Sequence, residues 1–118
     1  MDGRDEYVRR VLEAYRRTPG TTGCVRRPDR VLAAQLHERC VALSVIENAL
    51  VLAAARRLFR TAPAGMPPLP PLGTIRSLAY FVPVIEEVLA LGASQEYFRY
   101  LRSKVEGAVG RLRAASGE

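Results

Sequence analysis

The sequence contains no tryptophan, one lysine, one histidine and two cysteines. With a single histidine and no Gly-x-Ser-x-Gly, P-loop or His-Glu-x-x-His pattern, it lacks the parts of hydrolases and metalloenzymes. Cys24 and Cys40 form no Cys-x-x-Cys pair, so we expect two reduced thiols rather than a zinc site or a disulfide. On a helix the side chains of Glu86 and Glu87 would point about 100° apart, so they do not form the two facing carboxylates that a glycosidase needs. We therefore expect a binding protein, not an enzyme, without metal or cofactor.

Long apolar runs are also missing. No run approaches the roughly 18 to 20 residues of a membrane span, and residues 1–6 are too charged for a secretory signal. We therefore expect a cytoplasmic protein without membrane contact. At 118 residues, with 48% apolar and 25% charged residues, the chain has the size and balance of one folded domain that covers residues 1–118.

Positive charge is abundant. The 18 basic residues, of which Lys104 is the one lysine, outnumber 12 acidic residues and give a net charge of +6. Abundant arginine, alanine, glycine and proline are typical of a GC-rich genome, so codon usage explains the arginine bias itself. Guanidinium groups nevertheless attract phosphates and can bind phosphate or guanine through two parallel hydrogen bonds. Nucleic acid is therefore the leading candidate partner, and we favour DNA over RNA.

Apolar residues recur with helical spacing, and no stretch alternates as a strand would. The third helix opens on Ser44-Val45-Ile46-Glu47, which has the form of a capping box, and is apolar nearly all round from Ala49 to Ala55. This composition predicts that the third helix is the buried centre. The five expected helices cover about residues 4–17, 28–39, 44–60, 75–91 and 94–113.

Prolines and glycines separate these segments. Residues 61–73 contain five prolines and two glycines, which predicts an extended connector; the proline run 67–71 could instead be a polyproline ligand. Pro83 should kink the fourth helix or split it, Gly92 should end it, and Ser94 should cap the fifth. The predicted architecture is all-α, an irregular or orthogonal bundle of four to six helices. The inward residues expected on the fifth helix are Tyr97, Leu101, Val105, Ala108 and Leu112.

The second and third helices, joined by residues 40–43, have the dimensions of a helix-turn-helix. In that motif the second helix enters the DNA major groove, and Glu47 and Asn48 near its start would be the candidate base-reading residues. Cys40 stands where such turns favour glycine, and the reading helix would be apolar along its middle. Ordinary packing of two helices in a bundle is therefore the alternative interpretation.

Three groups of basic residues could contact phosphates. Two of them flank the helix pair, and the third lies on the last helix. The alternative is that they are solvated helix faces, because Asp29, Glu38 and Glu47 lie close enough in sequence to neutralise part of the charge. The groups are Arg26, Arg27 and Arg30; Arg56, Arg57 and Arg60; and Arg99, Arg102 and Lys104.

Pro70-Pro71 followed by residues 75–87 resembles a stretch in short, uncharacterised bacterial helical proteins associated with mobile genetic elements. The similarity extends to residues 53–60 and 97–101, about half of the chain. Residues 72–74 and Cys40 depart from the pattern. The resemblance implies a setting of transposition, recombination or plasmid replication, and it carries no catalytic residues.

Two hypotheses follow from the sequence. The first is a nucleic-acid-binding accessory protein that contacts phosphates through the arginine groups. The second is a protein-interaction module that docks on a larger recombinase, polymerase or effector, or self-assembles, through an exposed apolar helix face.

Overall fold

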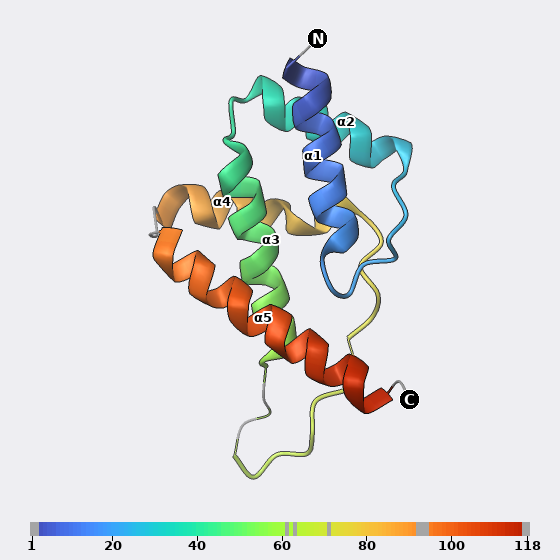
Figure 1. Ribbon diagram of the computed structural model, residues 1–118, viewed down its shortest axis with the longest axis vertical. Helices are drawn as coiled ribbons and strands as arrows, with labels where there is room; N and C mark the ends of the chain where they lie inside the picture. Colours follow the sequence, from blue (N-terminus) through green and yellow to red (C-terminus); the bar gives the residue numbers. More distant parts are fainter. Residues whose placement is uncertain (1–2, 61, 63, 71, 92–94, 117–118) are drawn as a thin grey trace.

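The computed structural model describes residues 3–60, 62, 64–70, 72–91 and 95–116, and the described part of the chain is helical (Figure 1). Its elements confirm the predicted all-α bundle. No described helix is both long and apolar enough to cross a membrane. The helices are α1 (Gly3–Arg17), α2 (Arg27–Glu38), α3 (Leu43–Leu58), the short 3-10 helix η1 (Leu78–Phe81), α4 (Val82–Leu91) and α5 (Gln95–Ser116).

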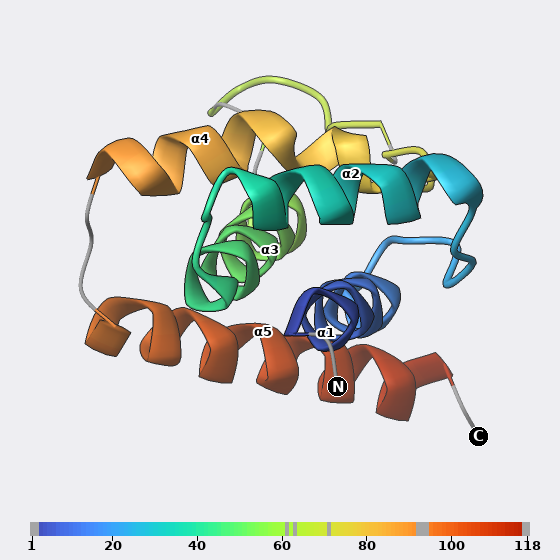
Figure 2. The same cartoon turned by 90° about the horizontal axis from the view of Figure 1, so that it is seen from above.

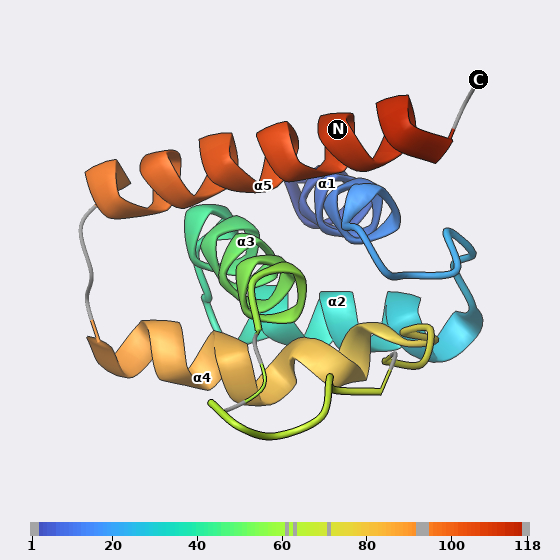
Figure 3. The ribbon, with the colours of Figure 1, turned by 90° about the horizontal axis from the view of Figure 1, so that it is seen from below.

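The helices form three layers, which Figures 2 and 3 show from opposite sides. The middle layer contains α1 and α3, which pack on each other. One face of this layer is covered by α2 and α4, and the opposite face is covered by α5. Because α5 packs mainly on α3, the part of this second face toward the end of α1 has less cover.

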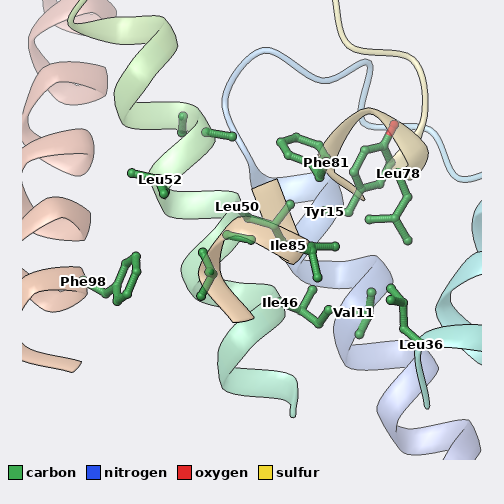
Figure 4. Close-up of a cluster of buried hydrophobic side chains, with 14 of the residues drawn as sticks. Val11, Tyr15, Leu36, Ile46, Leu50, Leu52, Leu78, Phe81, Ile85 and Phe98 are labelled. Carbon is green, nitrogen blue, oxygen red and sulfur yellow. The ribbon is translucent and has the colours of Figure 1, made fainter. Parts of the chain in front are cut away.

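The third helix is the centre of the core, as its composition predicted. Eight of its residues are buried, and four of these are alanines that let α1, α4 and α5 approach closely. In Figure 4, Phe98 points from α5 toward one side of α3, whereas Tyr15 and Phe81 lie on the other side. The eight residues are Ile46, Asn48, Ala49, Leu50, Leu52, Ala53, Ala54 and Ala55.

The predicted capping box at the start of the third helix is wrong. The helix begins at Leu43, and Ala42 is its N-cap. The backbone N–H groups of Val45 and Ile46 already donate to the carbonyl of Ala42, so Ser44 lies inside the first turn. The helix also ends at Leu58, two residues before the predicted end.

The fourth predicted helix is split, with η1 leading directly into α4. Pro83 is the second residue of α4, where the missing N–H needs no helical partner. The prediction that the helix starts at Ile75 is wrong. Ile75 is extended and pairs with the loop after α1, donating its N–H to the carbonyl of Gly20 at 2.7 Å and accepting from Thr22 at 3.0 Å. Gly92 and Ser94, the predicted stop and cap, lie outside the described residues.

The prediction for the inward face of α5 needs one correction. Leu101 and Val105 are buried as expected, but Phe98 is the buried aromatic residue, whereas Tyr97 is 48% exposed. The side chain of Leu112 lies outside the described part of the chain. The described residues of the 61–73 connector contain no helix or strand, as the prolines predicted.

Candidate nucleic-acid interface

The turn between α2 and α3 has a well-defined C-terminal cap. The Val41 N–H donates to the carbonyl of Leu36 and the Cys40 N–H donates to the carbonyl of His37, which together form a Schellman motif. Cys40 has a φ of 60°, the left-handed conformation that favours glycine. The glycine preference noted at this position in the sequence therefore has a structural cause.

The third helix is not placed to read DNA. A reading helix must project far enough to enter the DNA groove, but α3 lies packed among α1, α4 and α5, and its remaining surface is recessed between helices. Asn48, predicted to contact bases, is only 6% exposed and lies in the core. Glu47 is half-buried in a groove between helices. The proposed base-reading role of Glu47 and Asn48 therefore does not fit this fold, and bundle packing is the better interpretation of the helix pair.

The second arginine group, at the end of α3, is bound within the fold. Arg56 forms a bidentate ion pair with Glu87 of α4, with nitrogen–oxygen distances of 2.8 and 2.5 Å. Arg60 donates to the carbonyl of Pro70. These contacts fasten α4 and the proline-rich connector to α3. The sequence did not show these internal partners, and the phosphate-binding role of Arg56, Arg57 and Arg60 stays a prediction.

Arg57 has the most contacts of this group. It donates to the carbonyl of Gly73 at 2.7 Å and to the hydroxyl of Tyr80 at 3.2 Å, and its guanidinium lies over the Tyr80 ring. Gly20, at a φ of +95°, lies against the same guanidinium, and a Cβ there would come within 3.1 Å of it. Arg57 therefore joins the end of α3 to the loop after α1, the connector and η1.

The third basic group does not form one patch. Arg99, Arg102 and Lys104 are all exposed on α5, but residues 102 and 104 point about 200° apart on a helix. Arg102 lines the groove beside α1 and α3. Lys104 lies over the rings of Phe59 and Tyr100, at 5.0 and 5.8 Å.

The first basic group does gather on the surface, at the start of α2. Arg27 and Arg30 are one turn apart and exposed, and Arg26 is the exposed N-cap residue. The Arg26 guanidinium donates to the carbonyl of Arg76 at 2.9 Å, which brings a fourth exposed arginine beside the group. We call Arg26, Arg27, Arg30 and Arg76 the α2 patch. None of its members forms an ion pair with a carboxylate in the described part of the chain.

Asp29 was expected to neutralise part of this charge, but its carboxylate is occupied elsewhere. The side chain is 2% exposed. One oxygen accepts from the Arg26 N–H and the other from the Leu78 N–H, both at 2.9 Å. Both carboxylate oxygens thus bind backbone N–H groups, and none of the four exposed arginines of the α2 patch forms an ion pair with Asp29 in the described part of the chain.

Many of the other arginines have acidic partners. Arg9 pairs with Glu6, and Arg39 forms a bidentate ion pair with Glu86, with nitrogen–oxygen distances of 2.9 and 3.3 Å. The hydrogen bonds from Arg39 lower the pKa of Glu86 below its ordinary value. Arg16 and Arg17 both contact Glu13. In the described part of the chain the α2 patch shares its lack of ion pairs with Arg10, Arg57 and Arg102, so what distinguishes it is that its arginines gather at one place.

Sequence reasoning missed Arg76. It stands 50 positions from Arg26 and has no basic neighbour in sequence, so only the packing of the segment before η1 brings it to α2.

Cys24 and Cys40 are both exposed thiols. The described residues contain no group of three side chains that could hold a metal. No known protein family, curated protein or solved structure matches the chain.

Proposed function

We propose that the protein binds nucleic acid through the α2 patch, as an accessory protein and not as an enzyme. The observation that carries the proposal is that three exposed arginines gather at the start of α2, and that Arg26 holds the backbone of exposed Arg76 beside them. Arginine forks suit phosphate oxygens, and the positive end of the α2 dipole adds to the attraction.

Binding through this patch contacts the phosphate backbone, with little reading of base sequence. Phosphate contacts fix position and orientation, whereas sequence is read at base edges by an element that enters a groove. The two candidates for base reading do not project from the bundle, because Asn48 is buried and Glu47 is half-buried. The resemblance to proteins of mobile elements makes DNA of a transposition, recombination or replication system the favoured ligand.

Salt dependence tests the proposal. A labelled DNA duplex should bind most tightly at low salt, and four phosphate contacts give a slope of log K against log salt of about −3.6. The triple variant Arg27→Ala, Arg30→Ala, Arg76→Ala should reduce the magnitude of that slope by about 2.7, because it removes three contacts. Arg26 is kept because its guanidinium holds the backbone of Arg76, in the segment before η1.

The matched control removes the same charge elsewhere. Arg9→Ala, Arg10→Ala, Arg111→Ala changes three exposed arginines of α1 and α5 and should keep most of the affinity and slope. If this control weakens binding as much as the α2 variant does, net charge and not the patch attracts DNA. If the natural chain binds no duplex at low salt, the proposal is wrong.

A further inference from the structure

A groove runs along α3, on the face of the middle layer that α5 covers. Its larger part, of about 750 Å³, lies between the end of α1, α3 and the second half of α5. A smaller part of about 220 Å³ continues toward the end of α3. Both parts are lined by Pro19, Gly20 and Ala54, so they form one continuous depression. From Glu47 to Leu58 it follows α3 for about 17 Å, or roughly three helical turns.

The floor of the groove is apolar and incompletely covered. Val51 and Leu58 of α3 and Val109 of α5 are half-buried, although they pack against the core. The cause is the layer arrangement: two helices cover the opposite face of α1 and α3, but α5 packs mainly on α3. The bundle thus leaves an elongated apolar surface beside α5 that another helix could cover.

The rim of the groove is mainly basic. Two glutamates, Glu47 and Glu106, line it, and Glu13 contacts two of the rim arginines without lining the groove. Even when Glu13 is counted, five positive charges face three negative ones. The five rim arginines are Arg16, Arg17, Arg57, Arg60 and Arg102.

We propose that this groove docks an amphipathic helix of a partner protein that carries apolar residues on one face and acidic residues beside them. The half-buried valines and leucine would receive the apolar face, as in other helix-in-groove complexes. The basic rim complements an acidic flank. The half-buried apolar floor suits the apolar face of a helix better than it suits a phosphate backbone, although the rim alone could attract either. The protein would then join a nucleic acid at the α2 patch to a protein at the groove.

Selection from random peptides tests the proposal without a known partner. Phage-displayed peptides of about 16 residues are selected on the full chain, and each is long enough to cover the groove as a helix. The enriched peptides should carry apolar residues at spacings of three and four and a net negative charge. Their dissociation constants should rise at least tenfold for Val51→Asp. The matched control, Val31→Asp, changes a valine of α2 that is 48% exposed and should bind as the natural chain does.

Arg102→Glu keeps the test decisive if Val51→Asp does not fold by circular dichroism. It changes an exposed rim residue and should also weaken acidic peptides. The proposal is overturned if no peptide family is enriched, or if the enriched peptides bind Val51→Asp and Arg102→Glu unchanged. It is also overturned if DNA displaces the peptides in competition. Self-association that Val51→Asp abolishes would overturn it too, because a second copy would then occupy the groove.

Discussion

The carboxylate of Asp29 accepts a hydrogen bond from the backbone N–H of Leu78, 49 residues further along the chain. Its second oxygen accepts from the N–H of Arg26, so one buried side chain caps α2 and holds the first residue of η1. These contacts use both carboxylate oxygens, so Asp29 forms no ion pair with an arginine of the α2 patch in the described chain. A stabilising interaction thus also determines the electrostatics of the candidate site.

Removing the Asp29 carboxylate should be costly. Asp29→Ala leaves two backbone donors without their acceptor and should lower the free energy of unfolding by about 3 kcal/mol. Asp29→Asn keeps one acceptor oxygen and should lose about half as much. Urea unfolding followed by circular dichroism measures both. A change in Asp29→Ala within about 0.5 kcal/mol would show that these hydrogen bonds contribute little.

Glycine should suit position 40 better than cysteine. The residue occupies the left-handed position of the Schellman motif that ends α2, where a Cβ is unfavourable. We expect Cys40→Gly to stabilise the protein by about 1 kcal/mol, measured by thermal unfolding. Cys40→Ala, which keeps the Cβ, is the control and should show no comparable gain. Equal stabilities of the glycine and alanine variants would contradict a strained conformation.

Two tyrosines on α1 should respond oppositely to the loss of the hydroxyl. Tyr15 is fully buried, and its hydroxyl has no hydrogen-bond partner among the described residues, so Tyr15→Phe should stabilise the fold by about 1 kcal/mol. Its edge-to-face contact with Phe81 would be kept. Tyr7 donates to the carbonyl of Val41 at 2.8 Å, so Tyr7→Phe should destabilise by a similar amount. The two variants are compared by urea unfolding, and a loss of stability in Tyr15→Phe would be contrary to the prediction.

Acid should weaken the fold through the ion pairs of α4. Hydrogen bonds from Arg39 and Arg56 hold the pKa values of Glu86 and Glu87 below the ordinary 4.5 in the folded chain. In the unfolded chain the pKa values return to the ordinary value, so the stabilisation is complete above pH 4.5 and is lost as the pH falls through the folded-state pKa values. Melting temperatures of the natural chain and of Glu86→Gln, Glu87→Gln should therefore differ at neutral pH and converge in acid.

The control for the pH series is Glu38→Gln, Glu96→Gln. Both residues are exposed, and neither forms one of the ion pairs of the described chain. The melting curve of the control should run parallel to that of the natural chain at every pH. A gap between the Glu86, Glu87 variant and the natural chain that stays constant into strong acid would exclude the ion pairs as its cause.

The sequence by itself determined the helices and much of the core. Helical periodicity and prolines act over a few residues, so α1, α2 and the connector could be predicted, as could the division of the fourth helix near Pro83. The apolar composition of α3 was enough to predict its central position. The capping box failed because the pattern does not distinguish an N-cap from a serine inside the first turn.

The tertiary structure alone decided which charges remain at the surface. Arg39 meets Glu86, Arg56 meets Glu87, and Arg26 meets the backbone of Arg76, across 47, 31 and 50 positions of sequence. Such pairs depend on how the helices and the connector pack, and periodicity carries no information about distances of this kind. For the same reason the sequence alone did not show that Arg56, Arg57 and Arg60 contact other parts of the fold, or that Arg76 lies beside α2.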